Sequence, residues 1–173
     1  MRIYLRPLTL DDTNIIIKWR NDPQVLEHCL SKQRITENSH LSFYKEKIET
    51  GLYKQFIVER IEDQSGVATY PIATVYLKNI DNVNNSCELC VFTSNDSEWI
   101  SESQTIAVKM LIEKAFTDYG IHKIYTYVFC DYIDEIELLK SAGFKEESIL
   151  KEEARNGSGE YVDIIRLCMF NRS

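Results

Sequence analysis

The sequence lacks the features of membrane-spanning, secreted and nucleic-acid-binding proteins. No apolar run approaches the ~20 residues that a membrane-spanning helix needs. The first residues alternate polar and apolar side chains and contain no apolar stretch of the signal-peptide kind. No lysine- or arginine-rich cluster stands out from a formal net charge of −7, which argues against non-specific binding of nucleic acid. These absences predict a cytoplasmic protein with no nucleic-acid partner and no membrane partner.

Cysteine is scarce and shows no pattern of pairing. The five cysteines are an odd number, and only Cys87 and Cys90 have a spacing found in metal or redox sites. Both fall in a strand pattern, where residues three apart point to opposite faces. We therefore expect small side chains in a reduced core and no metal site.

The composition is that of an ordinary globular protein, with 44% hydrophobic and 27% charged residues. The 173 residues contain no repeat, linker or low-complexity segment. One domain covering residues 1–173 is expected.

Alternation, helical spacing and turn residues divide the chain into strands and helices. Strands are expected at residues 2–7, 55–61, 70–80, 88–93, 121–129, 144–153 and 160–170. One helix begins after Thr9 with a T-x-x-D signal and is broken at residues 21–23; another is capped by Thr36 and ends at Gly51. Further helices are expected at 101–119 and 132–142, a polar turn at 63–66 and a hairpin turn at 156–159.

This order predicts an α/β (α+β) fold with a mixed, mostly antiparallel, seven-stranded sheet and helices on both faces. The long helix at 101–119 lies between two strands, so it forms a right-handed crossover. The fourth and fifth strands should therefore be parallel.

Five segments, in the same order along nearly the whole chain, resemble the GCN5-related N-acetyltransferases. They are residues 3–12, 19–25 (W-R-N-D-P-Q-V), 88–90 (E-L-C), 139–147 and 157–163. The nearest subgroups are the ribosomal-protein N-terminal acetyltransferases and the N-acetyltransferases of nucleotide-linked amino sugars. The resemblance implies that the parallel fourth and fifth strands splay apart at their C-terminal ends, leaving a V-shaped cleft.

The same resemblance implies transfer of an acetyl group from acetyl-CoA to a primary amine, without a metal. It assigns pantetheine binding to the backbone of Cys90, Val91 and Phe92, beside the splay. The pyrophosphate would lie at a helix N-terminus, where unpaired N–H groups favour an anion. That helix begins at Ser101, Glu102, Ser103, Gln104 and Thr105.

The catalytic candidates are one carboxylate and one phenol. Glu88 is the candidate general base, with a solvated strand residue as the alternative. Tyr132 is the candidate proton donor to the leaving thiolate, because the tyrosine common in the family falls on Leu139 in this chain.

The phosphate loop departs from the family pattern. Its two glycines fall on Ile100 and Glu102, and glycine there lets the backbone approach the phosphates. Residues 101–104 also form an S-x-x-Q capping box, in which Ser101 would occupy the N–H of Gln104. We expect weak binding of acetyl-CoA, and a binding module that has lost catalysis is the alternative to an enzyme.

Acceptor binding is expected from the first two helices. The residues expected to contact the acceptor are Trp19, Arg20, His40 and Phe43. The motif favours a small-molecule amine, a nucleotide-linked amino sugar, whose diphosphate would be met by Arg20, Lys32 or Arg34. A protein N-terminus is the alternative that the net charge favours, and a homodimer is the assembly considered.

Overall fold

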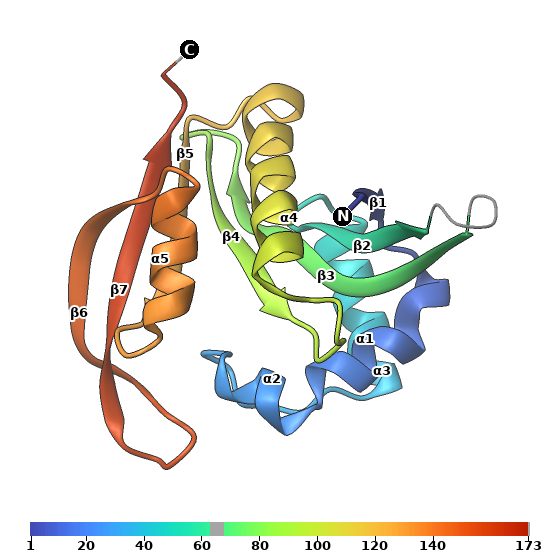
Figure 1. Cartoon of the computed structure of the whole chain (residues 1–173), viewed down its shortest axis with the longest axis horizontal. Coiled ribbons are helices and arrows are strands. Elements are labelled where there is room, and N and C mark those ends of the chain that lie inside the picture. Colours follow the sequence, from blue (N-terminus) through green and yellow to red (C-terminus); the bar gives the residue numbers. More distant parts are fainter. Residues whose placement is uncertain (63–67, 173) are drawn as a thin grey trace.

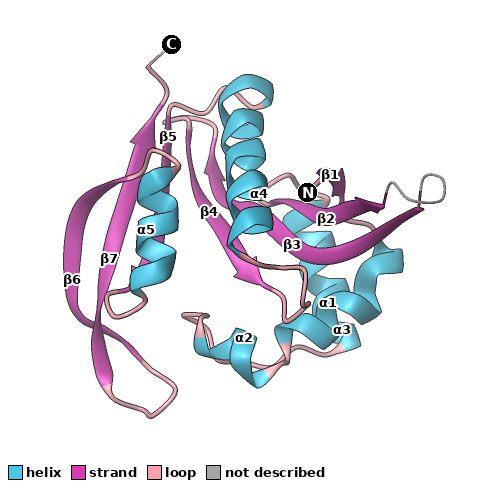
Figure 2. Ribbon diagram, viewed as in Figure 1, coloured by secondary structure: helices cyan, strands magenta, loops and turns pink. Residues whose placement is uncertain are grey.

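The computed structural model describes residues 1–62 and 68–172, which form one sheet with helices on both faces (Figures 1 and 2). The strands are β1 (Ile3–Pro7), β2 (Lys54–Glu62), β3 (Ala68–Asp81), β4 (Ser86–Thr93), β5 (Lys123–Phe129), β6 (Lys145–Arg155) and β7 (Tyr161–Phe170). The helices are α1 (Thr13–Arg20), α2 (Pro23–Glu27), α3 (Glu37–Phe43), α4 (Ser101–Glu113) and α5 (Ile133–Ser141). Short helical turns precede or extend them at η1 (Leu10–Asp12), η2 (Tyr44–Ile48) and η3 (Lys114–Asp118).

The seven strands lie in the order β1-β2-β3-β4-β5-β7-β6, and among the described pairs only β4 and β5 are parallel. The expected mixed, mostly antiparallel sheet is confirmed. The hairpin turn expected at 156–159 joins β6 to β7, whereas the polar turn expected at 63–66 lies outside the described residues.

The parallel pair separates after three residues. Its ladder joins residues 86–88 to residues 123–125 and goes no further, and the two strands diverge below that point in Figure 1. Where the ladder ends, the Thr126 hydroxyl donates to the Leu89 carbonyl at 2.9 Å, so a side chain replaces the missing strand partner. The expected V-shaped separation is confirmed.

Two cores hold the layers together. The larger lies between the sheet and the helices α4 and α5, which cover the face seen in Figure 1. The smaller lies on the opposite face, where Ile16 and Trp19 of α1 pack on Leu8 and Ile57. A tryptophan 2% exposed is a core residue, so Trp19 supports α1 from within the molecule.

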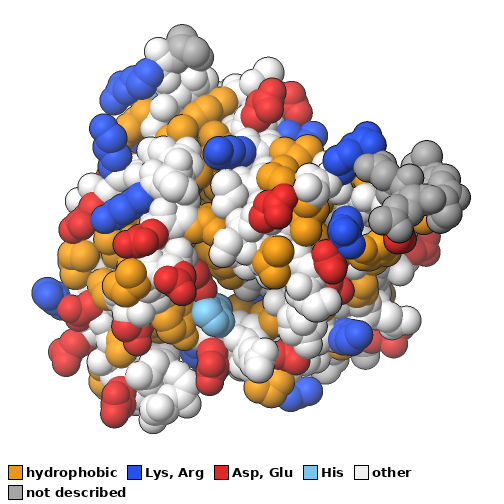
Figure 3. Space-filling model, in the orientation of Figure 1, with side chains coloured by type: hydrophobic (Ala, Val, Ile, Leu, Met, Phe, Trp, Pro, Cys, Tyr) orange, Lys and Arg blue, Asp and Glu red, His pale blue; other side chains and the backbone are white. Residues whose placement is uncertain are grey.

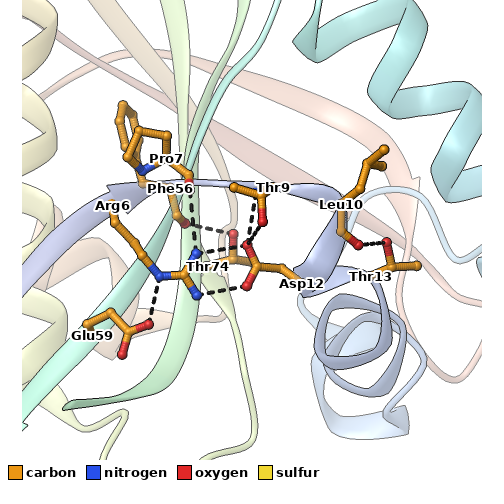
Figure 4. Close-up of polar contacts among 9 residues, drawn as sticks. All are labelled: Arg6, Pro7, Thr9, Leu10, Asp12, Thr13, Phe56, Glu59 and Thr74. Carbon is orange, nitrogen blue, oxygen red and sulfur yellow. Dashed lines mark hydrogen bonds and ion pairs between the residues drawn. The ribbon is translucent and has the colours of Figure 1, made fainter. Parts of the chain in front are cut away.

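Helix α1 is fixed to the sheet by a network of charges at its start (Figure 4). Arg6 of β1 forms two hydrogen bonds to the Asp12 carboxylate, of 2.7 and 2.9 Å, and a third to Glu59 of β2, of 2.8 Å. Burial alone would raise the pKa of Asp12, but the hydrogen bonds from Arg6 and Thr9 outweigh it and lower that pKa. The T-x-x-D signal therefore also joins the helix to two strands.

The sequence break at residues 21–23 ends α1 and starts another helix, α2, which periodicity did not predict. The Asp22 carboxylate accepts from the N–H of Gln24 at 2.9 Å, and Pro23 occupies the first helical position. Both residues are favoured where they stand, because Asp caps orphan N–H groups and Pro needs no partner for its nitrogen. The Asp-Pro pair was thus an available signal for α2.

None of the described helices combines the length and the apolar character that a bilayer-spanning helix requires. The five cysteines form no disulfide, and Cys87 lies in the larger core. No group of three or more potential metal ligands occurs in the described part of the chain.

Candidate active site

Three neighbouring cavities surround the separation of β4 and β5. The fork pocket, of about 110 Å³, lies where the strands part. The front pocket, of about 530 Å³, lies between α2, the end of β4 and the helices α4 and α5. The rear pocket, of about 320 Å³, lies between α1, α3 and the opposite face of the sheet. The fork pocket shares residues with both neighbours, so groups entering from the two sides can meet there.

The first turn of α4 borders the front pocket with unpaired donors. The first helical bond runs from the Gln104 N–H to the Ile100 carbonyl at 2.9 Å, and the N–H groups of residues 101–103 donate to no described atom. Such groups favour an anion through their partial positive charge. Ser101, Gln104 and Thr105 line the pocket, as expected of a phosphate-binding turn.

The expected S-x-x-Q capping box is wrong. The helix begins one residue earlier than that box requires, so Ser101 is inside the helix and does not cap Gln104. The buried Ser103, the third residue of the helix, bonds back to the residue before the helix instead. Its hydroxyl accepts from the Ile100 N–H at 2.9 Å and donates to the Glu98 carbonyl at 2.6 Å. These contacts leave the unpaired N–H groups of the first turn in place.

Glu102 points away from the front pocket. Its carboxylate pairs with the N-terminal ammonium of Met1 at 3.0 Å, and neither Glu102 nor Ser103 lines the cavity. The negative charge that was expected to repel a phosphate at this position is therefore paired with the Met1 ammonium, outside the pocket.

Negative charge in the front pocket comes from α5. Asp134, Glu135 and Glu137 line it, and no Lys or Arg is among its described lining residues. Figure 3 shows acidic side chains gathered around the hollow on this face. Apart from His28, an anionic ligand in this pocket is therefore met by backbone N–H groups and neutral side chains.

Glu88 lies at the fork, buried, on the face of the sheet opposite to α4. Lys78 stands directly across from it on β3, with its ammonium 3.3 Å from the carboxylate. The Cys90 thiol donates to the same carboxylate at 3.6 Å, and burial raises the pKa of that thiol to about 12, so it stays protonated. Glu88 is thus a buried carboxylate with two fixed partners beside a cavity, not a solvated strand residue.

The backbone of residues 90–92 lies beyond the ladder with β5. Its β5-facing N–H and C=O groups therefore have no described strand partner on that side, while on the other side Cys90 pairs with Tyr76 of β3 and the register shifts at residues 91–92. Cys90, Val91 and Phe92 all line the fork pocket, and Phe92 also lines the front pocket. A chain-like ligand entering from the front could add to β4 there.

Tyr132 does not reach the fork. Its hydroxyl donates to the Glu27 carbonyl at 2.9 Å, and its ring packs against His28 and Phe129. It lines a separate surface hollow. The expected proton donor is therefore engaged in joining α5 to α2, and Tyr76 and Tyr127 are the phenols that line the fork pocket.

A second contact joins the same two helices. His28, at the end of α2, pairs with the Glu135 carboxylate of α5, and this hydrogen bond raises the pKa of His28. Both residues line the front and fork pockets, so the pair stands at the passage between them. No local signal in the sequence could have linked two residues 107 positions apart.

The rear pocket contains three of the four residues expected to bind the acceptor. Arg20, His40 and Phe43 line it, whereas Trp19 lies in the smaller core and lines no described pocket. Phe43 contacts Tyr53 edge to face at 5.2 Å, and Tyr53 stacks on Tyr76 at 6.1 Å. These rings form a continuous aromatic wall.

Comparison with known proteins identifies relatives of this arrangement. Residues 2–145 match the family model described as an acetyltransferase (GNAT) domain. The spermidine N(1)-acetyltransferase of Escherichia coli K12 is 25% identical, covering 97% of this chain and 86% of that protein. The Vibrio cholerae spermidine N(1)-acetyltransferase is 22% identical, with coverages of 96% and 91%.

A solved structure agrees with the fold. The crystal structure of spermidine N-acetyltransferase from Vibrio cholerae in complex with CoA and spermine superposes with a TM-score of 0.84 at 22% identity. The superposition covers 97% of this chain and 95% of that one. At this identity the likeness establishes a shared architecture.

Proposed function

This chain belongs to the acetyltransferase (GNAT) family, and on that premise we propose that it transfers the acetyl group of acetyl-CoA to a primary amine at the fork between β4 and β5. The residues that the pockets share carry the proposal. The fork pocket shares His28, Phe92 and Glu135 with the front pocket. It shares Arg20, Tyr76 and Lys78 with the rear pocket. A thioester from one face can therefore meet an amine from the other.

Acetyl-CoA fits the front pocket by its chemistry. The pantetheine arm carries amides that can bond to the β5-facing backbone of residues 90–92. The pyrophosphate finds the unpaired N–H groups of residues 101–103. The acidic side chains of α5 oppose the remaining phosphate charge, so affinity for acetyl-CoA should be modest.

Glu88 is the proposed base. An ammonium must lose a proton before its nitrogen can attack the thioester carbonyl, and a carboxylate in reach of that nitrogen accepts the proton directly or through water. Attack gives a tetrahedral intermediate; its collapse breaks the C–S bond and releases the CoA thiolate with the amide product. No covalent enzyme intermediate is required.

The leaving thiolate needs a proton or a hydrogen bond. Tyr76 lines both the fork and rear pockets, and burial raises the pKa of its phenol well above the usual value. A phenol that stays protonated at neutral pH is suited to donate to a thiolate. We assign this role to Tyr76 in place of Tyr132.

The acceptor amine is a polyamine or an amino sugar according to whether the relatives or the sequence motif is followed. The relatives named above are spermidine N-acetyltransferases, which favours a polyamine as the acceptor. The nucleotide-linked amino sugar expected from the sequence gains no support from these comparisons.

Thiol release from acetyl-CoA tests the reaction. Purified protein is incubated with acetyl-CoA and a panel of amines: spermidine, amino sugars with and without phosphate, amino acids and N-terminal peptides. Amine-dependent release of CoA with formation of the acetylated amine is expected. Absence of release with every amine, in protein that binds acetyl-CoA, would contradict the proposal.

A further inference from the structure

We propose that the acceptor carries an anionic group, a carboxylate or a phosphate ester, in addition to its primary amine. This inference rests on the proposed function and names the substrate class of the same site. It arises from the charge of the rear pocket, where Arg20, Arg34 and Lys78 line the cavity. No Asp or Glu is among the described residues that line it.

Two of these three cations lack a counter-ion. Lys78 is balanced by Glu88 at 3.3 Å. Arg34 forms no hydrogen bond or ion pair with any described residue. Arg20 contacts the Cys29 thiol at 3.1 Å and pairs with no carboxylate in the described part of the chain. Two guanidinium groups beside a cavity are suited to bidentate binding of carboxylate or phosphate oxygens.

The charges are also arranged in order. Arg34 lines the rear pocket and not the fork pocket, Arg20 lines both, and Glu88 lines the fork pocket and not the rear pocket. An amine bearing an anion would place the anion at the arginines and direct its ammonium toward the carboxylate at the fork. That orientation delivers the nitrogen to the thioester.

The charge of the rear pocket disfavours a polyamine. Each of its ammonium groups that remained in the rear pocket would face uncompensated guanidinium groups, and like charges brought together disfavour binding. The carboxylates available for such ammonium groups lie in the front pocket, on α5.

A buried nitrogen gives an independent indication of a polar ligand. His40 is 3% exposed, lines the rear pocket, and its Nε2 has no hydrogen-bond partner among the described residues. Burial lowers the pKa of His40, so the ring is neutral at neutral pH and can donate or accept at Nε2. Buried polar groups are almost always paired, so we expect a hydroxyl or an anionic oxygen of the acceptor to be the partner of this nitrogen.

Matched pairs of ligands test the inference by calorimetry. Glucosamine 6-phosphate is compared with glucosamine, L-phenylalanine with its amide, and both pairs with spermidine, each in the presence of CoA. The anionic member of at least one pair should bind at least tenfold more tightly than its neutral partner and more tightly than spermidine. The pair that shows the preference identifies phosphate or carboxylate as the anion.

Substitution then locates the preference. The double variant R20Q R34Q should lose it, and R34Q alone, at an exposed position, should weaken it without disturbing the fold. R155Q removes the same charge from the β6 end of the hairpin, where Arg155 contacts Tyr161, and should leave the preference intact. Circular dichroism confirms that each variant is folded.

The outcomes separate the inference from the reaction. Tighter binding of spermidine, equal or undetectable binding of both members of each pair, or a preference that persists in R20Q R34Q would overturn the inference. Thiol release with spermidine alone would also overturn it while supporting the acetyltransferase reaction. An anion preference without thiol release from any amine would overturn the reaction and retain the binding site.

Discussion

The front and rear pockets lie on opposite faces of one sheet and differ in how they present charge. The front pocket offers backbone N–H groups at the start of α4 and carries the carboxylates of α5. The rear pocket offers side chains, with arginines, a buried histidine and an aromatic wall. Binding by backbone N–H groups requires only that the fold forms, because every residue except proline supplies the same group. Binding by side chains requires particular residues at particular positions. The donor side should therefore tolerate substitution better than the acceptor side.

The largest effect is expected where the two pockets meet. Glu88→Gln keeps the shape of the side chain and removes the base, so kcat should fall roughly 10²–10⁴-fold. Acetyl-CoA affinity, measured by calorimetry, should stay nearly unchanged because the donor pocket does not contain Glu88. Glu102→Gln, at a carboxylate that faces Met1, is the matched control and should retain activity. An active E88Q enzyme would move the role to water or to His40.

A smaller effect is expected from loosening the rear pocket alone. Asp12→Asn removes the charge that anchors Arg6, and loss of hydrogen bonds to a charged, partly buried group should lower the free energy of unfolding by about 2 kcal/mol. Because Asp12 precedes α1, which carries Arg20, the KM for the acceptor should rise more than the KM for acetyl-CoA. Chemical denaturation and steady-state kinetics measure the two effects.

The neighbouring carboxylate provides the control for that variant. Asp11 is exposed and takes no part in the network, so Asp11→Asn should leave stability and both KM values unchanged. Equal changes in the two KM values of D12N would contradict the independence of the two pockets.

Removing charge from α5 should improve binding of acetyl-CoA. Asp134 and Glu137 are exposed and line the front pocket, so D134N E137Q should tighten binding about three- to tenfold by relieving repulsion of the phosphates. The gain should shrink as salt is added. Glu153→Gln on β6, outside the pocket, should have no such effect. Unchanged affinity of the double variant would show that the phosphates bind away from α5.

The smallest effect concerns the contact between α2 and α5. Glu135 raises the pKa of His28 above its usual 6.5, so the pair stabilises the fold fully below about pH 6.5 and loses that contribution as pH rises through the raised pKa. The contribution should be no more than about 1 kcal/mol, because His28 is partly exposed. Urea denaturation of the protein and of E135Q, from pH 6 to 9, should show their stabilities converging. Parallel curves would contradict the coupling.

Helix caps and turns show which features of this fold a single sequence predicts. Helix starts at Thr9 and Thr36 and the hairpin at 156–159 were predicted correctly, because caps and turns depend on side chains within a few positions of the backbone they serve. The capping box predicted at Ser101 was wrong because two candidate serines lie close together. The two serines lie within three positions of each other, and only the burial of Ser103 in the folded chain decides which of them bonds.

The sequence by itself determined the order of the strands, the helices other than α2, and the parallel pair, since alternation and helical spacing mark the elements and a helix between two strands makes them parallel. The separation of that pair and most residues facing the pockets were implied by the resemblance to the acetyltransferases. Only the tertiary structure decided how those residues act. It placed Trp19 in the core, tied Tyr132 to Glu27, and brought His28 to Glu135 across 107 positions. Charge balance between distant segments depends on distances of a few ångström, which no local pattern encodes, and for that reason the opposite charges of the two pockets became visible only in the folded chain.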